Sequence, residues 1–203
     1  MKSTRYQKRL FKFITPMVLS AILCITSPGF AQIPNLSNSN KLTQLTKLTK
    51  SQIITAQNQS PLSIEQQARS HFNQGDLSQA VQLFRESVQK YATSGNTTRQ
   101  ALSLSNLSLS YQQLGQWNNA TESITKAINL LENTKNPTNQ TDLALAQAFN
   151  IQGGLQLARG QANPALESWK SATDIYTRLN KPAQVLTTST NQSQALQNLG
   201  LYR

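Results

Sequence analysis

The sequence predicts an all-α fold: a solenoid of about seven antiparallel helices, arranged as three helical hairpins and a C-terminal capping helix. Three observations lead to this prediction. A glycine–alanine pattern recurs, apolar residues between the glycines follow helical spacing, and turn-forming residues separate the segments. The pattern starts at Gly75, Gly115 and Gly160, so its spacing is 40 and then 45 residues. Such a period is typical of stacked helical units, because one unit alone cannot bury its apolar face.

Each repeat places small and large residues at fixed distances from its glycine. An alanine follows after five residues, a large apolar residue four later, and a small residue three further on. A small residue also recurs in the segment before each glycine, where two helices would cross closely. The three sets that follow a glycine are Ala80, Phe84 and Ser87, then Ala120, Ile124 and Ala127, then Ala165, Trp169 and Ala172. The small residues at the expected helix crossings are Ala68, Ser108, Gly153 and Ser193.

The helices expected from this register cover residues 64–73, 79–91, 99–114, 120–131, 142–159, 164–179 and 182–199. The second helix of each hairpin is expected to begin behind a residue with a good capping side chain: Ser78, Asn118 and Asn163. The stretch 102–110 alternates partly like a strand. Its leucines also fit a helical face, and the repeat register favours the helix.

The first 31 residues predict a cleavable signal peptide. Basic residues up to Lys12 precede a short apolar segment, and the small residues Gly29 and Ala31 flank the expected cleavage site. An uncleaved membrane anchor is the alternative. It is disfavoured because a spanning helix needs about 20 apolar residues, and Pro16 and Pro28 interrupt this segment. The expected location is the periplasm or the extracellular space.

Residues 32–60 predict a polar disordered tether between the signal peptide and the helical domain, residues 61–203. The tract is rich in Ser, Thr, Asn, Gln and Lys, and ordering it would cost more than its burial returns. Leu42, Leu45 and Leu48 are spaced by threes, so a weak amphipathic helix and a short docking segment remain alternatives.

Composition argues against several classes of site. The formal net charge is +11, but from residue 61 onward 11 basic residues stand against 8 acidic ones and are scattered. A nucleic-acid surface needs a concentrated basic patch, so no nucleic-acid partner is expected. Cys24, the only cysteine, lies in the predicted signal peptide. We expect no metal, no cofactor and no membrane association of the mature form.

The units resemble tetratricopeptide repeats, a family of helical hairpins that pack into superhelices. The best match is the second unit, with Leu104, Leu107, Ser108, Tyr111, Gly115, Ala120, Ile124 and Ala127 at the family positions. The family unit has 34 residues, so the longer spacing here implies longer helices and loops. The signal peptide, the amide-rich composition and the long repeats look like the N-terminal part of secreted cyanobacterial proteins. Those often continue into a caspase-like domain called CHAT.

The resemblance implies a concave groove lined by the first helix of each hairpin. Carried over to this chain, its lining is Glu65, Arg69, Phe72, Asn73, Ser105, Leu109, Gln112, Gln113, Asn150, Leu157 and Gln194. We expect His71 and both tryptophans to pack between helices. Glu65 and Arg69, four residues apart, are expected to form an exposed ion pair.

The sequence therefore predicts an exported, non-catalytic interaction scaffold whose partner is a protein or peptide segment in this groove. The alternative is a truncated N-terminal remnant of a larger secreted TPR–CHAT protein without independent activity. No enzymatic activity is expected, since the CHAT chemistry requires a cysteine with its histidine and the mature chain contains no cysteine.

We predict that protein recovered from outside the cytoplasm begins at Gln32. Mass spectrometry of its intact N-terminus measures this directly. Replacing the residue before the cleavage site, Ala31→Arg, should leave the first 31 residues attached, because signal peptidases require a small residue there. Wild-type protein that carries Met1 in a membrane fraction would contradict the prediction.

Overall fold

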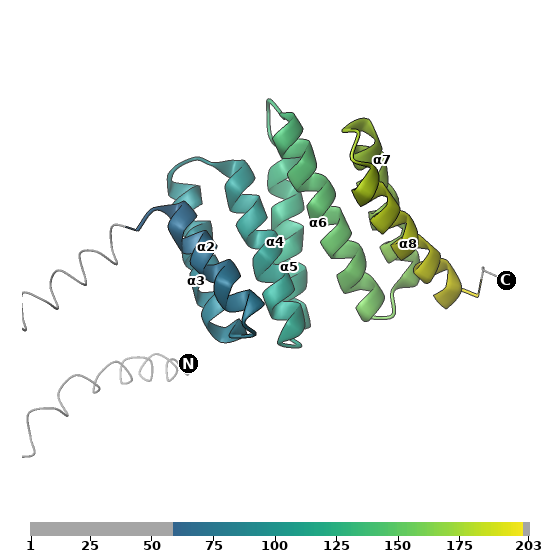
Figure 1. Cartoon of the computed structure of the whole chain (residues 1–203), viewed down its shortest axis with the longest axis horizontal. Helices are drawn as coiled ribbons and strands as arrows, with labels where there is room; N and C mark the ends of the chain where they lie inside the picture. Colours follow the sequence, from purple (N-terminus) through teal and green to yellow (C-terminus); the bar gives the residue numbers. More distant parts are fainter. Residues whose placement is uncertain (1–58, 201–203) are drawn as a thin grey trace, which may run out of the picture. The chain divides into compact units, whose positions relative to one another are not determined.

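Seven α-helices follow one another along residues 59–200, the part of the chain that the computed structural model describes (Figure 1). No β-strand occurs in this part. The helices are α2 (Pro61–Asn73), α3 (Leu77–Thr93), α4 (Thr97–Gln113), α5 (Trp117–Glu132), α6 (Asn139–Ala158), α7 (Ala162–Arg178) and α8 (Pro182–Asn198). The predicted all-α solenoid is confirmed. The predicted signal peptide and nearly all of the predicted tether lie outside the described residues.

The helices form two rows. Each helix packs against the next one along the chain, as α2 does against α3 and α6 against α7 (Figure 1). In addition, α2 contacts α4, α4 contacts α6, and α6 contacts α8. No corresponding contact joins α3 to α5 or α5 to α7. The even-numbered row is therefore the more closely packed one.

Tight three-residue turns connect most helices, as after α2 and α4. Gly75 and Gly115 adopt φ angles of 82° and 70°, which residues that carry a side chain rarely adopt. The turn after α4 is closed by backbone bonds from Gly115 N to Gln112 O at 3.0 Å and from Gln116 N to Tyr111 O at 2.8 Å. These bonds pair carbonyls that the helix end would otherwise leave without a donor.

The predicted N-caps of the second helices are wrong by two residues. The structure has Asp76, Gln116 and Gln161 at the cap positions in place of Ser78, Asn118 and Asn163. Only the side chain of Asp76 caps, by accepting from Gln79 N at 3.3 Å. The left-handed glycine already reverses the chain, so the helix begins immediately after the cap residue without needing a Ser or Asn.

The first and third hairpins also begin earlier than expected. The side chain of Ser60 accepts from Ser63 N at 3.1 Å, and Pro61 is the first residue of α2. Proline suits that position because its missing N–H has no partner inside the helix. The helix α6 begins at Asn139 behind Thr138, whose hydroxyl accepts from Thr141 N at 3.2 Å.

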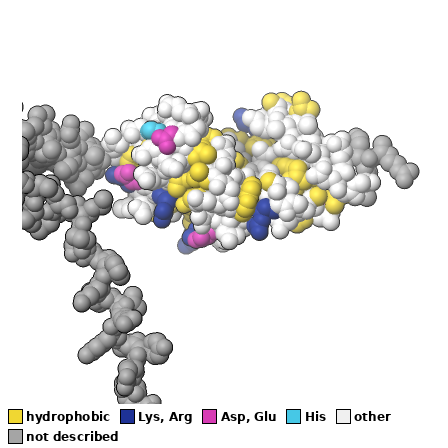
Figure 2. All heavy atoms as spheres, turned by 90° about the horizontal axis from the view of Figure 1, so that it is seen from below, with side chains coloured by type: hydrophobic (Ala, Val, Ile, Leu, Met, Phe, Trp, Pro, Cys, Tyr) yellow, Lys and Arg dark blue, Asp and Glu magenta, His cyan; other side chains and the backbone are white. Residues whose placement is uncertain are grey.

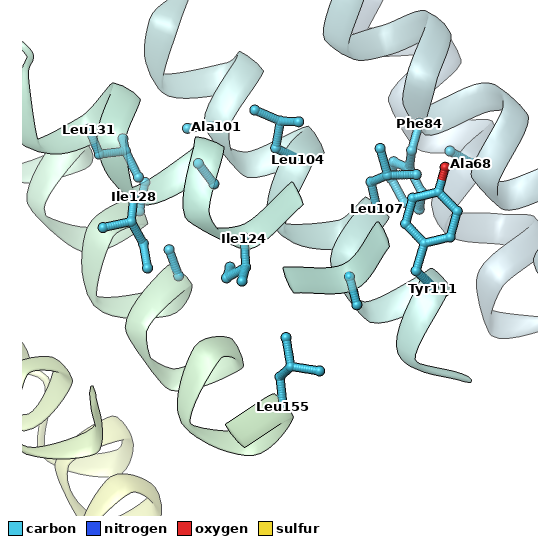
Figure 3. Close-up of a cluster of buried hydrophobic side chains, with 14 of the residues drawn as sticks. Ala68, Phe84, Ala101, Leu104, Leu107, Tyr111, Ile124, Ile128, Leu131 and Leu155 are labelled. Atoms are coloured by element: carbon cyan, nitrogen blue, oxygen red, sulfur yellow. The ribbon is translucent and has the colours of Figure 1, made fainter. Parts of the chain in front are cut away.

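The core confirms the repeat register. The alanines of the pattern are fully buried, and the large apolar residues that follow them are at most 2% exposed: Ala80, Ala120, Ala165, Phe84, Ile124 and Trp169. Ala68 is surrounded by Phe84, Leu107 and Tyr111 (Figure 3). The same core cluster includes Ile124, Ile128 and Leu131 of α5. Burying such a stripe on each helix supplies the main stabilisation of a repeat stack.

The strand-like stretch 102–110 is helical, and its serines are part of the reason. Ser105 and Ser110 are buried, and each hydroxyl donates to the carbonyl four residues earlier, at 3.0 Å. Ser108 Oγ donates across the hairpin to the Ala120 carbonyl at 2.9 Å. Each buried hydroxyl thus has an acceptor, which removes most of the cost of burial.

Two packing predictions are wrong. Trp117 is 40% exposed, because it is the first residue of α5 and its side chain projects from the helix end. His71 is half-exposed, and its Nδ1 lies 3.1 Å from Asp76 Oδ2, the cap of the next helix. Trp169, by contrast, is buried as expected, at 2% exposure.

Within the described residues, no helix is both long enough and apolar enough to cross a membrane. The last helix, α8, buries only Thr188 and Ala195 against α7, and its Leu186 is 70% exposed. Apart from that leucine its outer side is mostly Thr, Ser and Gln, which fits the expected capping helix.

The neighbouring glycines of α6 provide a matched test of the crossing. A Cβ on Gly153 would lie 2.6 Å from Trp169 Nε1, whereas a Cβ on Gly154 meets nothing within 4 Å. We expect Gly153→Ala to lower the free energy of unfolding by about 1–3 kcal/mol through overpacking. Gly154→Ala should raise it by about 0.5–1 kcal/mol through helix propensity. Urea unfolding followed by circular dichroism measures both, and equal shifts would contradict the crossing geometry.

Candidate binding groove

The even-numbered row carries two adjoining hollows. The first, of about 390 Å³, lies mainly between α4 and α6 and is lined by Arg69, Leu102, Ser105, Asn106, Gln140, Leu143, Ala144, Gln147, Asn150 and Ile151. The second, of about 690 Å³, is lined by Leu109, Gln112, Asn150, Ile151, Gly154, Leu157, Ala158, Trp169, Asn191, Gln194 and Asn198. Because Asn150 and Ile151 line both, the hollows are continuous, and we refer to them together as the even-row groove.

Helical spacing places these side chains on one face. On α4, Leu102, Ser105, Asn106 and Leu109 recur at three and four residues, which is the period of one helix face. The same spacing on α6 aligns Gln147, Asn150 and Ile151 with Gly154 and Leu157. The more closely packed row thus brings two helix faces of mixed polar and apolar side chains next to each other.

Seven of the eleven sequence-predicted residues line the groove: Arg69, Ser105, Leu109, Gln112, Asn150, Leu157 and Gln194. Four do not. Phe72 is half-buried and packs against the core, while Asn73 and Gln113 are exposed at the last residues of their helices. Glu65 is 1% exposed and faces other protein groups.

Glu65 therefore corrects two expectations, since it neither lines the groove nor forms an exposed ion pair. Its Oε1 accepts from Arg69 Nη2 at 2.9 Å and from Arg69 Nε at 3.2 Å. Its Oε2 accepts from the Tyr91 hydroxyl at 2.9 Å and from Arg99 Nη1 at 3.3 Å. The buried carboxylate thereby joins α2, α3 and α4, and two guanidinium groups offset its desolvation.

This network also changes the acidity of its tyrosine. Tyr91 is 5% exposed. Burial, together with the hydrogen bond to Glu65 and the charge of that carboxylate, raises the pKa of Tyr91 to about 12, and Arg99 opposes the rise. The phenol therefore stays protonated and continues to donate to Glu65 well above neutral pH. This holds the first hairpin against α4 and fixes the position of Arg69 at the edge of the groove.

The groove is almost uncharged. Arg69 is the only charged residue among those that line the two hollows, and its side chain is already paired with Glu65. On the face of the molecule that Figure 2 shows, charged side chains are likewise scattered among mostly uncharged ones. Amide and hydroxyl groups therefore determine what the groove can bind, and they both donate and accept hydrogen bonds.

The most informative lining residue, Asn106, was missed by sequence reasoning. Its Nδ2 is buried and has no hydrogen-bond partner among the described residues. A buried donor without an acceptor costs free energy, so natural folds rarely keep one without a use. A signal was available, since Asn106 directly follows Ser105 and precedes Leu109 by three residues, and both were predicted to line the groove.

The centre of the groove is held rigidly. Asn191 Nδ2 of α8 donates to Asn150 Oδ1 at 3.2 Å, and Trp169 Nε1 donates to the Asn150 carbonyl at 3.1 Å. Asn150 is thus braced from α7 and α8. Below it, Ile151, Leu157 and Trp169 provide an apolar floor. The groove combines oriented amides with a small apolar patch.

The described residues offer little for catalysis. They contain no group of three or more His, Cys, Asp or Glu side chains able to hold a metal ion. The only histidine, His71, pairs with the helix cap Asp76 and does not line the groove. Because no nucleophile is placed beside it, an activated dyad of the kind that hydrolases use is not formed by these residues.

Comparisons with known proteins agree with this geometry. A family model described as "Tetratricopeptide repeat" matches residues 64–94, which form the first hairpin. Among solved structures, the crystal structure of BtubC (BKLC) from P. vanneervenii is similar, with a TM-score of 0.63 and 17% sequence identity. That match covers 80% of this chain and 68% of the other. No curated protein sequence matches the chain significantly. At this identity, the likeness extends to the fold alone.

We predict a specific alkaline signature of the Glu65 network. Because the folded pKa of Tyr91 lies above the ordinary value near 10, ionisation favours the unfolded state. The stabilisation from Tyr91 is complete below about pH 10 and disappears toward about pH 12. The free-energy gap between wild type and Tyr91→Phe, measured by urea unfolding, should therefore shrink across that range. A gap that stays constant over the range would contradict the buried hydrogen bond.

Proposed function

We propose that this chain, a repeat protein of the tetratricopeptide type, is an exported non-catalytic scaffold that binds an extended protein segment along the even-row groove. Repeats of this type serve as protein-interaction scaffolds, and stacks of them offer long surfaces rather than closed pockets. The groove extends from Arg69 on α2 to Asn198 on α8, so the proposed ligand crosses four helices.

The observation that carries the proposal is the unpartnered Asn106 Nδ2 inside this groove. An extended peptide presents a carbonyl at each residue, about every 3.3–3.6 Å. Because Nδ2 itself is buried, such a carbonyl can become its acceptor once the Asn106 side chain rotates toward the groove. Gln147, Asn150 and Gln194, further along the same surface, can continue the recognition of a main chain irrespective of its sequence.

The chemistry of the groove also sets the expected strength and salt response of binding. The groove mixes amide and hydroxyl groups with apolar side chains such as Leu109 and Ile151, so binding gains only moderately from apolar burial and we expect dissociation constants of about micromolar order. Because Arg69 is the only charged lining residue, binding should change little with ionic strength. Selectivity is expected to come from the apolar floor formed by Ile151, Leu157 and Trp169.

The first test separates recognition from stability at one residue. Asn106→Leu removes the unpartnered donor while keeping the branched shape and the number of side-chain heavy atoms, so it should leave the free energy of unfolding unchanged or raise it by about 1 kcal/mol. Peptides selected against the wild type from a random 12-residue display library should bind this variant at least about tenfold more weakly. Fluorescence anisotropy measures binding, and urea unfolding measures stability.

A matched variant, Asn118→Leu, controls for the change in surface hydrophobicity. Asn118 is exposed on α5 and lines neither hollow of the groove. Its replacement should leave peptide binding unchanged. If the selected peptides bind Asn106→Leu as tightly as they bind the wild type, the groove assignment is wrong.

A further inference from the structure

We propose a second docking site on the opposite row: a hollow between α3 and α5 that receives a partner segment in which leucine-like side chains are flanked by carboxylates. This odd-row hollow has a volume of about 860 Å³ and is lined by Val88, Thr97, Gln100, Leu104, Lys126, Asn129, Leu130, Asn133, Thr134 and Lys135. None of these residues belongs to the even-row groove, so the proposal goes beyond the function proposed above and is independent of it.

The hollow follows from the way the rows pack. α3 and α5 both contact α4 but not each other, so a space remains between them on the odd-numbered side. The first half of α4, through Thr97, Gln100 and Leu104, lies at the base of this space. The volume is within the range of about 300–1,000 Å³ that ligand sites occupy.

The base of the hollow is apolar and continuous with the core. Leu104 is 6% exposed and belongs to the main core cluster. Val88 and Leu130 are half-buried and pack against the same cluster from the two sides. An aliphatic side chain inserted between them would therefore add to an existing apolar surface and leave water, which is the favourable part of such docking.

The rim of the hollow is positively charged. Lys126 and Lys135 line it, and no Asp or Glu does. Lys126 pairs with Glu122, but both of these side chains are more than 60% exposed, so water weakens the pair and a ligand carboxylate can share the ammonium. Lys135 forms no ion pair with any described residue. The first turn of α4, where Thr97 lies, adds the partial positive charge of a helix N-terminus, and the last turn of α5, where Asn129 and Leu130 lie, offsets it with a partial negative charge. The two lysines therefore account for the net positive charge of the rim.

Two of the other polar side chains of the rim are already hydrogen-bonded within the fold. Asn133 Nδ2 donates to the Asn129 carbonyl at 2.7 Å, and Thr134 Oγ1 donates to the Leu130 carbonyl at 2.9 Å. These bonds pair carbonyls at the end of α5. Thr97, Gln100 and Asn129 can still form neutral hydrogen bonds with a ligand, and the two lysines are the only charged recognition groups of the lining. The combination of an apolar base and a cationic rim defines the occupant: an acidic segment that carries leucine-like side chains.

A short synthetic peptide tests the site directly. The probe is fluorescein-labelled Asp-Glu-Leu-Leu-Glu-Asp, compared with versions in which serines replace the leucines or lysines replace the acids. We expect the probe to bind the full chain, both substituted versions to lose binding, and the affinity to fall several-fold from about 50 to 500 mM NaCl. Lys126→Glu with Lys135→Glu should weaken binding by about tenfold or more, because like charges then face the probe.

Matched variants make the result specific. The control for the lysine variant is Lys170→Glu with Lys181→Glu, which changes the net charge by the same amount. Lys170, like Lys126, pairs with a glutamate of its own helix, but neither Lys170 nor Lys181 lines the hollow. Val88→Thr makes the base polar at nearly constant volume, and Val185→Thr on α8 is its control. The lysine and valine changes at the hollow should each weaken binding, whereas both control variants should bind as the wild type does.

Three results would overturn the proposal. The first is an equal loss of affinity in the two double lysine variants. The second is a loss of probe affinity in Asn106→Leu, which would mean that the probe binds in the even-row groove. The third is no binding at probe concentrations up to about 1 mM. Amide chemical-shift changes provide the location. They should cluster on α3, α5 and the first half of α4, and shifts confined to α6 and α8 would contradict the site.

Discussion

The close approach of two helices over a small residue is the constraint on which the rest of this structure depends. At the crossing of the second hairpin, Ser108 donates to the Ala120 carbonyl at 2.9 Å. In the third hairpin Gly153 leaves only enough room for the ring of Trp169. Side chains larger than these would separate the helices, because packed interiors do not yield to added volume. Since each crossing sets the distance within a hairpin, it also sets how the hairpins stack.

The stacking then generates two different surfaces. The even-numbered helices contact one another, and their facing amides and hydroxyls form a continuous, nearly uncharged groove. The odd-numbered helices do not touch, and between α3 and α5 the core remains accessible beside two lysines. One surface suits the main chain of an extended segment, and the other suits apolar side chains next to carboxylates. No residue belongs to both proposed sites, so a ligand in one would leave the lining of the other uncovered.

Polar groups inside the stack follow a consistent rule, with one exception. The buried serines of α4 donate to carbonyls, Ser87 and Ser103 bond each other at 2.9 Å, and Glu65 is enclosed by two arginines and a tyrosine. Each of these groups has partners within the fold. Asn106 Nδ2 has none, and Asn106 is among the residues that line the groove. The contrast supports a role for Asn106 in recognition rather than in folding.

The sequence by itself determined the helix type, the repeat register and the buried faces, because helical spacing and the need for a left-handed glycine are properties of neighbouring residues. Together with the resemblance to tetratricopeptide repeats, it also placed seven groove residues, including Leu109 and Asn150, since that family's groove is lined by the first helix of each hairpin. Only the tertiary structure determined that Glu65 is buried and paired, because its partners Tyr91 and Arg99 are 26 and 34 residues away in the chain. Only the tertiary structure left Asn106 Nδ2 without a partner and opened the hollow beside Lys135. Burial of a polar group and the space between two helices depend on groups that other helices bring, and no local pattern encodes them.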